Sequence, residues 1–509
     1  MTLSRIGLAL PAVLASTLVT AQEGVDSLID RAVTPLSDGL SAIIFYEIPL
    51  PYIEQGVPFI VLWLVVAALF FTFYFGFINL RAMKHAFRLV RGDYTSPDAA
   101  GEVTHFQALA TALSGTVGLG NIAGVALAVS LGGPGATFWM ILAGLLGMST
   151  KFVECTLGVK YRNEYADGTV SGGPMYYLSK GVAEEYPSLV LLGKALAVVF
   201  AVFCIGGTLG AGAMFQTNQA FSQLLNVTGG ETSALNGYGW LFGLVIALLV
   251  GMVIIGGIKS IARVTEKIVP IMGVLYVSAG LLVIGMNIEH LPAAFGSIIS
   301  GAFRPEGVYG GFVGVLIMGF RRAAFSNEAG VGSAAIAHAA VRTDKPVTEG
   351  LVALYEPFID TVVVCTITAL VIIITGSLVP GGNIEGVALT SRAFSTAFDW
   401  FPMVLLLAVL LFAFSTTISW SYYGLKSFTY LFGEGRNKEL VFKAVVLASI
   451  VVGSSINLAS VMDFADAMIL AMALPNLVGV YLLTPVVKRE LKTYWADYKA
   501  GRLQTYPQL

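Results

Sequence analysis

The chain has 509 residues, of which 56% are hydrophobic and only 12% are charged. Soluble globular proteins carry roughly 25% charged residues, so this composition excludes a soluble protein and indicates a polytopic α-helical membrane protein. The apolar runs are continuous and about 20 residues long, which excludes an outer-membrane barrel with its alternating pattern. The net charge of −2 favours no nucleic-acid partner.

The N-terminal residues 1–21 combine a basic start at Arg5, an apolar stretch over residues 6–19 and small residues before Gln22. This pattern predicts a signal peptide, either cleaved or retained as an uncleaved N-terminal helix. Residues 22–57 are mixed in character, and we expect them to form an extracytoplasmic segment.

Hydropathy predicts an all-α protein with about eleven transmembrane helices. One helix over residues 58–80 comes first, and the other ten divide into five over residues 104–287 and five over residues 310–487. Residues 488–509 form a polar tail. The first span of each group of five is interrupted by glycines. Because five is odd, these two spans run in opposite directions, which is typical of inverted-repeat transporters with a substrate site near the midplane.

Most of the 29 lysines and arginines fall on one side of the membrane if the mature N-terminus lies outside. Positively charged connections stay in the cytoplasm, so the sequence predicts an outside N-terminus and a cytoplasmic C-terminus in a bacterial inner (plasma) membrane. We assign Lys151 to the inner connections. The expected outer side holds only Arg5, Arg31, Arg304 and Arg392.

Two connections, residues 169–178 and 386–398, are too polar to cross the membrane. We expect each to form a short helix at the membrane surface. Such helices serve either as gates or as simple packing elements, and the sequence leaves both interpretations open.

The first interrupted span places Gly115, Gly118 and Gly120 in the middle of its apolar run. Each glycine lowers helix propensity by about 1 kcal/mol relative to alanine. Broken backbone within a membrane is tolerated only where it is buried in protein or lines a cavity. We therefore expect this helix to open at its centre.

The opened segment offers the chemistry of a shared ion and substrate site. Ser114 and Asn121 supply side-chain oxygens beside the released carbonyls, and Na⁺ is a hard cation that favours oxygen ligands. Thr116 supplies a third side-chain oxygen. The amides of a half-helix N-terminus nearby can bind a carboxylate, so the residues of this segment expected to contact substrate are Thr116, Gly118 and Gly120. The alternative is that the small residues simply allow close helix packing.

The second interrupted span contains Arg321, Arg322 and Glu328 within an apolar run. Each such charge costs about 2.5–3.5 kcal/mol at a bilayer centre, so we expect them to face a cavity or to pair. Arg321 or Arg322 could pair with Glu328 or Asp360, as a gate or as a structural ion pair. The residues expected to contact substrate at this break are Asn327 and Gly330.

Three motifs resemble the alanine or glycine:cation symporter family: GLGN at residues 118–121, GGPGATFWM at residues 132–140 and FSNEAGVGSA at residues 325–334. The resemblance covers roughly residues 58–490, with one departure at Ile141, where the family has a second tryptophan. It implies the leucine-transporter-type five-plus-five fold with one extra N-terminal helix. It also implies Na⁺-coupled uptake of alanine or glycine.

The resemblance further implies a Na⁺ site between the first broken span and the span over residues 404–430. Ser415, Thr416 and Thr417 carry the hydroxyl groups that match this site, although helix hydroxyls also commonly bond back to a carbonyl one turn earlier. Asn121 matches a ligand of a second Na⁺ in relatives that bind two.

Two buried amides and one ring complete the expected pocket. Gln216 and Asn218 need polar partners, which are either the substrate or a neighbouring helix. Trp420 would restrict the pocket to a small side chain, or serves as ordinary core packing. The remaining candidate ion or proton sites are Glu356, Asp360, Asp463 and Asp466.

The sequence therefore predicts a secondary active transporter, not an enzyme, that imports alanine or glycine with Na⁺ and needs no cofactor. The alternative is a proton-coupled amino-acid permease of the same fold, which would use an intramembrane acid or lysine. An intramembrane enzyme is a remote alternative, because the four histidines are scattered and no nucleophile–base pair is evident.

Overall fold

The computed structural model describes residues 39–49, 56–96, 99–303, 311–378 and 386–506, and the predicted signal peptide lies outside them. Within these ranges the chain is mainly helical. Its strands form two short antiparallel pairs, β1 (Glu47–Ile48) with β2 (Val57–Pro58) and β3 (Asn163–Glu164) with β4 (Val170–Ser171).

The first repeat follows the apolar helix α3 (Phe59–Tyr74), the short α4 (Ile78–Arg81) and the amphipathic α5 (Met83–Val90). Its elements are α6 (His105–Thr116), the π-helical turn η1 (Gly120–Gly124), α7 (Val125–Gly132), α8 (Gly135–Lys160), α11 (Val190–Gly207), η4 (Thr208–Met214), α12 (Phe215–Val227), α13 (Gly239–Ile254) and α14 (Gly257–Met286). The helix α15 (Leu291–Phe303) follows.

The second repeat begins with another interrupted helix. Its elements are α16 (Gly311–Asn327), α17 (Ala334–His338), α18 (Pro346–Val352), α19 (Tyr355–Pro357), η7 (Phe358–Cys365), α20 (Thr366–Ile374), α22 (Phe401–Phe432), α23 (Arg436–Gly453), α24 (Leu458–Ala471) and α25 (Ala473–Lys499).

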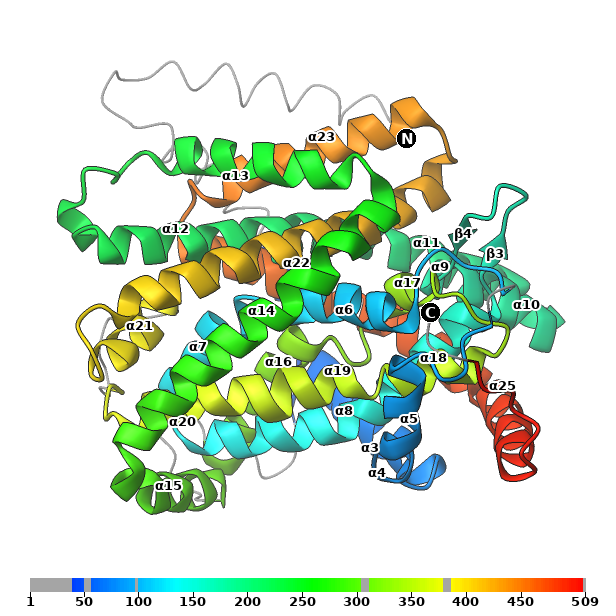
Figure 1. Cartoon of the computed structure of the whole chain (residues 1–509), viewed down its shortest axis with the longest axis horizontal. Helices are drawn as coiled ribbons and strands as arrows, with labels where there is room; N and C mark the ends of the chain where they lie inside the picture. Colours follow the sequence, from blue (N-terminus) through cyan, green and yellow to red (C-terminus); the bar gives the residue numbers. More distant parts are fainter. Residues whose placement is uncertain (1–38, 50–55, 97–98, 304–310, 379–385, 507–509) are drawn as a thin grey trace.

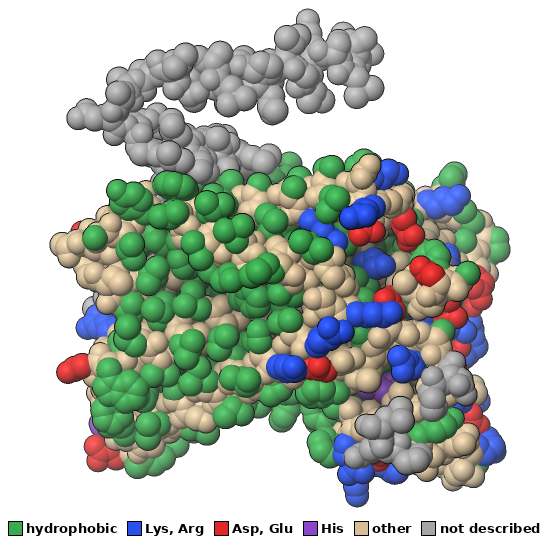
Figure 2. All heavy atoms as spheres, turned by 45° about the horizontal axis from the view of Figure 1, so that its top comes forward, with side chains coloured by type: hydrophobic (Ala, Val, Ile, Leu, Met, Phe, Trp, Pro, Cys, Tyr) green, Lys and Arg blue, Asp and Glu red, His purple; other side chains and the backbone are tan. Residues whose placement is uncertain are grey.

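Six helices of the described chain are long and apolar enough to cross a membrane, or seven if the bent pair α6–α7 counts as one span. The helices α3 and α13 are apolar but shorter. Figure 2 shows hydrophobic side chains over the middle of the face in view, with lysines and arginines gathered towards one end. An apolar band with charged ends is the surface that a bilayer requires.

The helices of the two repeats interlock. The helix α13 packs against α23, the fourth span of each repeat, and α8 packs along both α16 and α18. The helix α22 contacts α6, α11 and α12, so it lies between the interrupted span and the rest of the first repeat. In Figure 1 most of the long helices run roughly in parallel and α14 crosses them obliquely, with α21 (Val387–Ser395) at one end and α10 (Val182–Glu185) and α25 at the other.

Both polar connections form the expected short helices. Residues 169–178 contain α9 (Pro174–Tyr176), which follows Gly173, and residues 386–398 contain α21. The helix α21 contacts η1, α12 and α22, so it covers one side of the interrupted span. Its role as a gate stays a prediction.

The assignment of Lys151 to an inner connection is wrong. Lys151 lies inside α8 and is fully buried, with its Nζ atom 3.1 Å from Glu356 Oε2. A lysine in an apolar run is usually assigned to the end of the span. Here an ion pair with a residue of a distant helix allows the charge to stay inside the protein.

Candidate functional site

The first interrupted span opens as predicted. The helix α6 ends at Thr116, the helical path resumes at Gly120, and the two parts are bent by 50°. Val117 leaves the helix with ψ of 83°. The cause is local, because the glycines of this segment lower its propensity to form a helix.

The amides released by the opening are bonded to side chains. The Gly118 N–H donates to Asn121 Oδ1 (2.9 Å), and the Leu119 N–H donates to Gln216 Oε1 (2.9 Å). A Cβ atom at Gly118 would overlap Thr416 Oγ1 and lie 3.0 Å from Gln216 Oε1. Glycine is therefore required here by the close approach of α12 and α22.

Three of the four hydroxyl groups predicted to bind Na⁺ already have backbone partners. Ser114 Oγ donates to the carbonyl oxygen of Ser415 (2.6 Å), while Ser415 and Thr417 donate to carbonyls one turn earlier on α22. Thr416 Oγ1 is different: it is buried, faces Gly118 and has no hydrogen-bond partner in the described part of the chain. Such a hydroxyl costs about 1–3 kcal/mol if left unsatisfied, so its position points to a polar ligand.

Asn121 braces the opened segment against the second repeat. Its Nδ2 atom donates to Asp360 Oδ1 (2.5 Å) and to the Asp360 carbonyl (3.1 Å), while its Oδ1 atom accepts from Gly118. Ser326 and Thr361 donate to the other carboxylate oxygen of Asp360, at 2.9 and 2.7 Å. Asp360 therefore links the broken parts of both interrupted spans.

The second interrupted span breaks between Asn327 and Ala334. Glu328 adopts a left-handed backbone with φ of +56°, and Gly330 and Gly332 follow with φ of +92° and +88°. A non-glycine residue in this region costs about 1–3 kcal/mol, so the surrounding contacts must hold it. Asn327 supplies one of them, because its Nδ2 atom donates to Thr361 Oγ1 (2.9 Å).

Trp420 connects α22 to this second break. Its Nε1–H donates to Glu328 Oε1 (3.0 Å), and Ser333 donates to the other oxygen of Glu328. The Trp420 ring lies edge-on to Tyr423, with centroids 5.4 Å apart, and its side chain fills the space beside Gly212. Trp420 therefore lies in the protein interior, between the second break and η4.

The expected pairing of Arg321 or Arg322 with Glu328 or Asp360 is wrong. Both arginines bind Asp466 of α24, Arg321 through Nη2 at 2.7 Å and Arg322 through the same carboxylate oxygen. The reason is that Glu328 and Asp360 already have neutral donors, whereas Asp466 lies on a facing helix. Arg321 also stacks over the Phe45 ring at 3.9 Å.

The other predicted site residues have local partners. Thr116 donates to carbonyls of its own helix, and a Cβ at Gly120 would meet the Phe325 ring at 3.4 Å. Gln216 also donates to the Ala211 carbonyl (2.9 Å). Asn218 donates to carbonyls of two residues near the end of α23, so the neighbouring-helix interpretation holds for it in this conformation.

Sequence reasoning named Glu356 as a candidate ion or proton site but missed the buried chain to which it belongs. We name these five charged or titratable side chains the histidine–glutamate chain: His105, Glu349, His338, Glu356 and Lys151. Glu349 binds His105 Nδ1 at 2.5 Å and His338 Nδ1 at 2.6 Å, one through each oxygen. Glu356 binds His338 Nε2 and Lys151 Nζ, again one through each oxygen. The available signal was a lysine and two glutamates within apolar spans.

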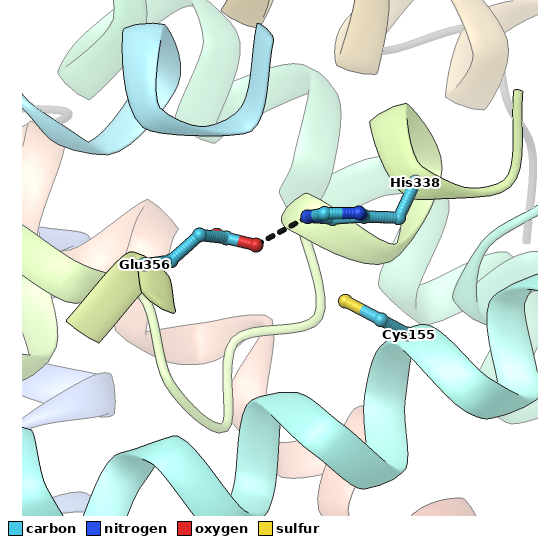
Figure 3. A group of neighbouring side chains, drawn as sticks. All are labelled: Cys155, His338 and Glu356. Atoms are coloured by element: carbon cyan, nitrogen blue, oxygen red, sulfur yellow. Dashed lines mark hydrogen bonds and ion pairs between the residues drawn. The ribbon is translucent and has the colours of Figure 1, made fainter. Parts of the chain in front are cut away.

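Cys155 lies beside this chain, with its sulfur directed towards His338 and Glu356 (Figure 3). The potential ligand atoms of these three residues all lie within 4.8 Å of one another. A metal ion would need lone pairs that are already engaged, because both ring nitrogens of His338 face glutamates and Glu356 also binds Lys151. The group therefore fits an ion-pair chain better than a metal site.

The sequence matches the model of the sodium:alanine symporter family over residues 51–508. It is 41% identical over 440 residues to the sodium/alanine symporter AgcS of Methanococcus maripaludis, covering 86% of this chain and 94% of that protein. It is 34% identical over 450 residues to the "probable sodium/glutamine symporter GlnT" of Bacillus subtilis, covering 87% and 89% of the two chains.

Among solved structures, the crystal structure of MhsT in complex with L-phenylalanine is similar, with a TM-score of 0.51 at 15% sequence identity. The match covers 77% of this chain and 99% of that chain. At this identity the likeness concerns the fold alone. It confirms the predicted fold of the leucine-transporter type, while the predicted number of about eleven transmembrane helices stays a prediction.

Proposed function

This chain belongs to the sodium:alanine symporter family, and on that premise we propose that it imports alanine or glycine together with Na⁺. Members of this family are membrane transporters and not enzymes. The observation that carries the Na⁺ part of the proposal is the buried, unpartnered hydroxyl of Thr416 opposite the opening of α6.

In this proposal Thr416 Oγ1 and the backbone carbonyls of the opened segment bind Na⁺. Ser114 and Ser415 already join α6 to α22 beside that position, and their oxygens are available to an ion that enters between the two helices. Thr417 and Asn121 complete the expected ligand set. Na⁺ then holds the opened helix against α22 and favours one state of the transporter by population shift.

The substrate would occupy the space between the two breaks. The amides at Gly118, Leu119 and Gly120 would present partial positive charge to a carboxylate, which would replace the side-chain oxygens of Asn121 and Gln216 that accept from two of them in this conformation. Asn327 and Gly330 contribute polar groups from the second break. Trp420 limits the room for a side chain, which favours alanine or glycine over a larger amino acid such as glutamine.

Alternating access requires an inner and an outer closure. We propose that the N-terminus lies outside a bacterial inner membrane and the C-terminus inside, as the distribution of basic residues predicts. Arg321, Arg322 and Glu328 are then gating candidates. The arginines would act through their contacts with Asp466. Glu328 would act through its contact with Trp420.

The experiment is uptake of radiolabelled alanine into proteoliposomes with and without an inward Na⁺ gradient. Na⁺-driven accumulation that unlabelled glycine competes away supports the proposal. Accumulation driven by a proton gradient without Na⁺ would favour the permease alternative, and no accumulation of either amino acid under any gradient would contradict the substrate assignment.

A further inference from the structure

The histidine–glutamate chain ties together the two half-helices that precede and follow the breaks. His105 stands at the start of α6, and His338 at the end of α17. Glu349 of α18 binds both of them, one through each carboxylate oxygen. The carboxylate of Glu349 therefore links α6, which is one half of the first interrupted span, to α17, which is one half of the second. The other halves of these spans are α7 and α16.

The geometry at His338 requires an additional proton. A neutral imidazole has one N–H donor and one acceptor nitrogen. Both ring nitrogens of His338 face carboxylate oxygens, which only accept when ionised. Either His338 is an imidazolium or one of the two glutamates is protonated. In both cases the group of Glu349, His338 and Glu356 holds one proton more than it would with a neutral histidine and two ionised glutamates.

The charges of the chain lead to the same count. With the additional proton, that proton and the Lys151 ammonium balance Glu349 and Glu356. His105 needs no charge, because only its Nδ1 atom is engaged and its Nε2 atom has no partner among the residues described. Without the proton the chain carries one uncompensated negative charge, which is strongly unfavourable where all five side chains are buried.

The surrounding groups do not supply a substitute for this proton. Glu154 of α8 accepts from Asn476 (2.6 Å), and Glu328 accepts from Trp420 and Ser333. Both bind neutral donors, so neither supplies a positive charge that could replace the proton. Cys155 of α8 and Tyr423 of α22 also face the chain and are neutral in their ordinary forms.

We propose that the histidine–glutamate chain is a proton-binding site, in which one bound proton keeps the inner halves of the two interrupted spans together. Loss of the proton leaves His338 with one donor for two carboxylates, which weakens its contact with Glu349 and lets α6 and α17 separate. The assignment of this side to the cytoplasm rests on the proposed function; the proton count does not.

Cys155 provides a native reporter for this proposal. In a Cys204→Ser/Cys365→Ser background, Cys155 is the remaining thiol, and its alkylation by N-ethylmaleimide measures opening beside the chain. Rates at each pH from 6 to 9 are divided by the rate for glutathione, which removes the titration of an ordinary thiol. A single linked proton changes the open population by at most about tenfold per pH unit.

We expect the normalised rate to rise with pH in the parent protein. The slope should vanish in Glu349→Gln, which needs no additional proton for neutrality, and in His338→Gln, which cannot carry one. His290→Gln is the matched control, because His290 is exposed and lies outside the chain, and it should keep the parent slope. A flat normalised rate in the parent protein would overturn the proposal.

A second measurement covers the case in which the variants do not fold. Na⁺-driven uptake by the unmodified protein is followed in proteoliposomes while the pH is varied on one face at a time. Dependence on the pH of the C-terminal face supports the proton site, and indifference to pH on both faces overturns it. Absent uptake with pH-dependent Cys155 labelling would instead contradict the proposed transport function alone.

Discussion

Thr416 and Gly118 face each other across the opened segment of α6, and each explains the other. The hydroxyl of Thr416 occupies the volume in which a side chain at residue 118 would lie. It is buried without a partner within the described ranges, whereas Ser114, Ser415 and Thr417 donate to carbonyls. At the scale of single residues, we expect removal of the Thr416 hydroxyl or addition of a methyl group at Gly118 to have the largest effect on Na⁺-driven uptake.

Substituting Thr416→Ala removes the proposed Na⁺ ligand while sparing the helix. We expect the Na⁺ concentration for half-maximal uptake to rise about tenfold, which corresponds to roughly 1.4 kcal/mol. Uptake against Na⁺ concentration measures this. Thr416→Ser, which keeps the hydroxyl, should remain near the parent value, and a well-inserted Thr416→Ala protein with an unchanged Na⁺ response would refute the assignment.

Substituting Gly118→Ala introduces a methyl group into the space held by Thr416 Oγ1 and Gln216 Oε1. We expect near-complete loss of Na⁺-driven uptake with normal membrane insertion, because the overlap displaces the opened segment. Gly124→Ala is the control in the same span, since a Cβ there meets nothing within 4 Å. Equal uptake by both variants would show that the close approach of Gly118 to Thr416 and Gln216 is not needed for transport.

At the scale of elements, buried carboxylates join helices that are distant in the chain. Asp466 attaches α24 to α16 through two arginines, and Asp360 attaches η7 to η1 and α16 through neutral donors. Removing one partner of a buried pair leaves a charge without compensation, which is far more costly than removing an exposed one.

Substituting Asp466→Asn should therefore destabilise the protein by about 3–5 kcal/mol, because Arg322 stays buried without a carboxylate. The thermal unfolding midpoint of the protein in detergent measures the effect. Asp399→Asn, at an exposed position, serves as the control and should change little. Identical midpoints for the two variants would contradict a stabilising role for the arginine–aspartate contact.

The docking of α25 on α5 should depend on pH through His85. Burial, together with nearby Arg88, lowers the pKa of His85 from 6.5 to about 4. His85 Nε2 lies 2.7 Å from the Tyr494 hydroxyl, and its ring packs on Tyr498 at 4.2 Å. A lowered pKa in the folded state means that the contact is fully stabilising above about pH 6.5 and loses strength as pH falls towards 4.

Hydrogen exchange at residues 490–499, corrected for intrinsic rates, measures that docking. Protection should fall between pH 6.5 and 4.5 in the parent protein. The His85→Gln variant, which does not titrate, should show no such change. Equal pH dependence in both proteins would place the titrating group elsewhere.

At the scale of the whole molecule, the basic residues are unevenly distributed between the two ends. The end that carries α5, α10 and the last turns of α25 holds most of them, as Figure 2 shows for one face. Lys488 reaches back to the carbonyl of Tyr74 (2.9 Å), which is typical of a lysine at a membrane boundary. The basic residues of the C-terminal part, residues 488–509, are Lys488, Arg489, Lys492, Lys499 and Arg502.

This asymmetry predicts that the C-terminus faces the cytoplasm. Trypsin should remove a C-terminal epitope tag from inside-out vesicles and leave it intact in right-side-out spheroplasts. A tag cleaved only from the outer face would reverse the orientation, and with it the side on which the histidine–glutamate chain lies.

Local features of the site could be predicted because their causes are local. Three glycines within six residues predicted the opening of α6, and positive φ at Gly330 and Gly332 agrees with the predicted second break. Partners across the fold could not be predicted. Asp466 lies 144 residues from Arg322, and Glu356 lies 205 residues from Lys151.

Composition and glycine spacing by themselves determined that this is a helical membrane protein with two broken spans, because hydrophobic length and helix propensity are properties of short stretches. Which charges meet depends on how the helices pack. His105 and His338 are scattered in the chain, yet one carboxylate binds both. A buried charge takes whichever partner the packed helices bring within reach, and that choice depends on the packing of helices from both repeats.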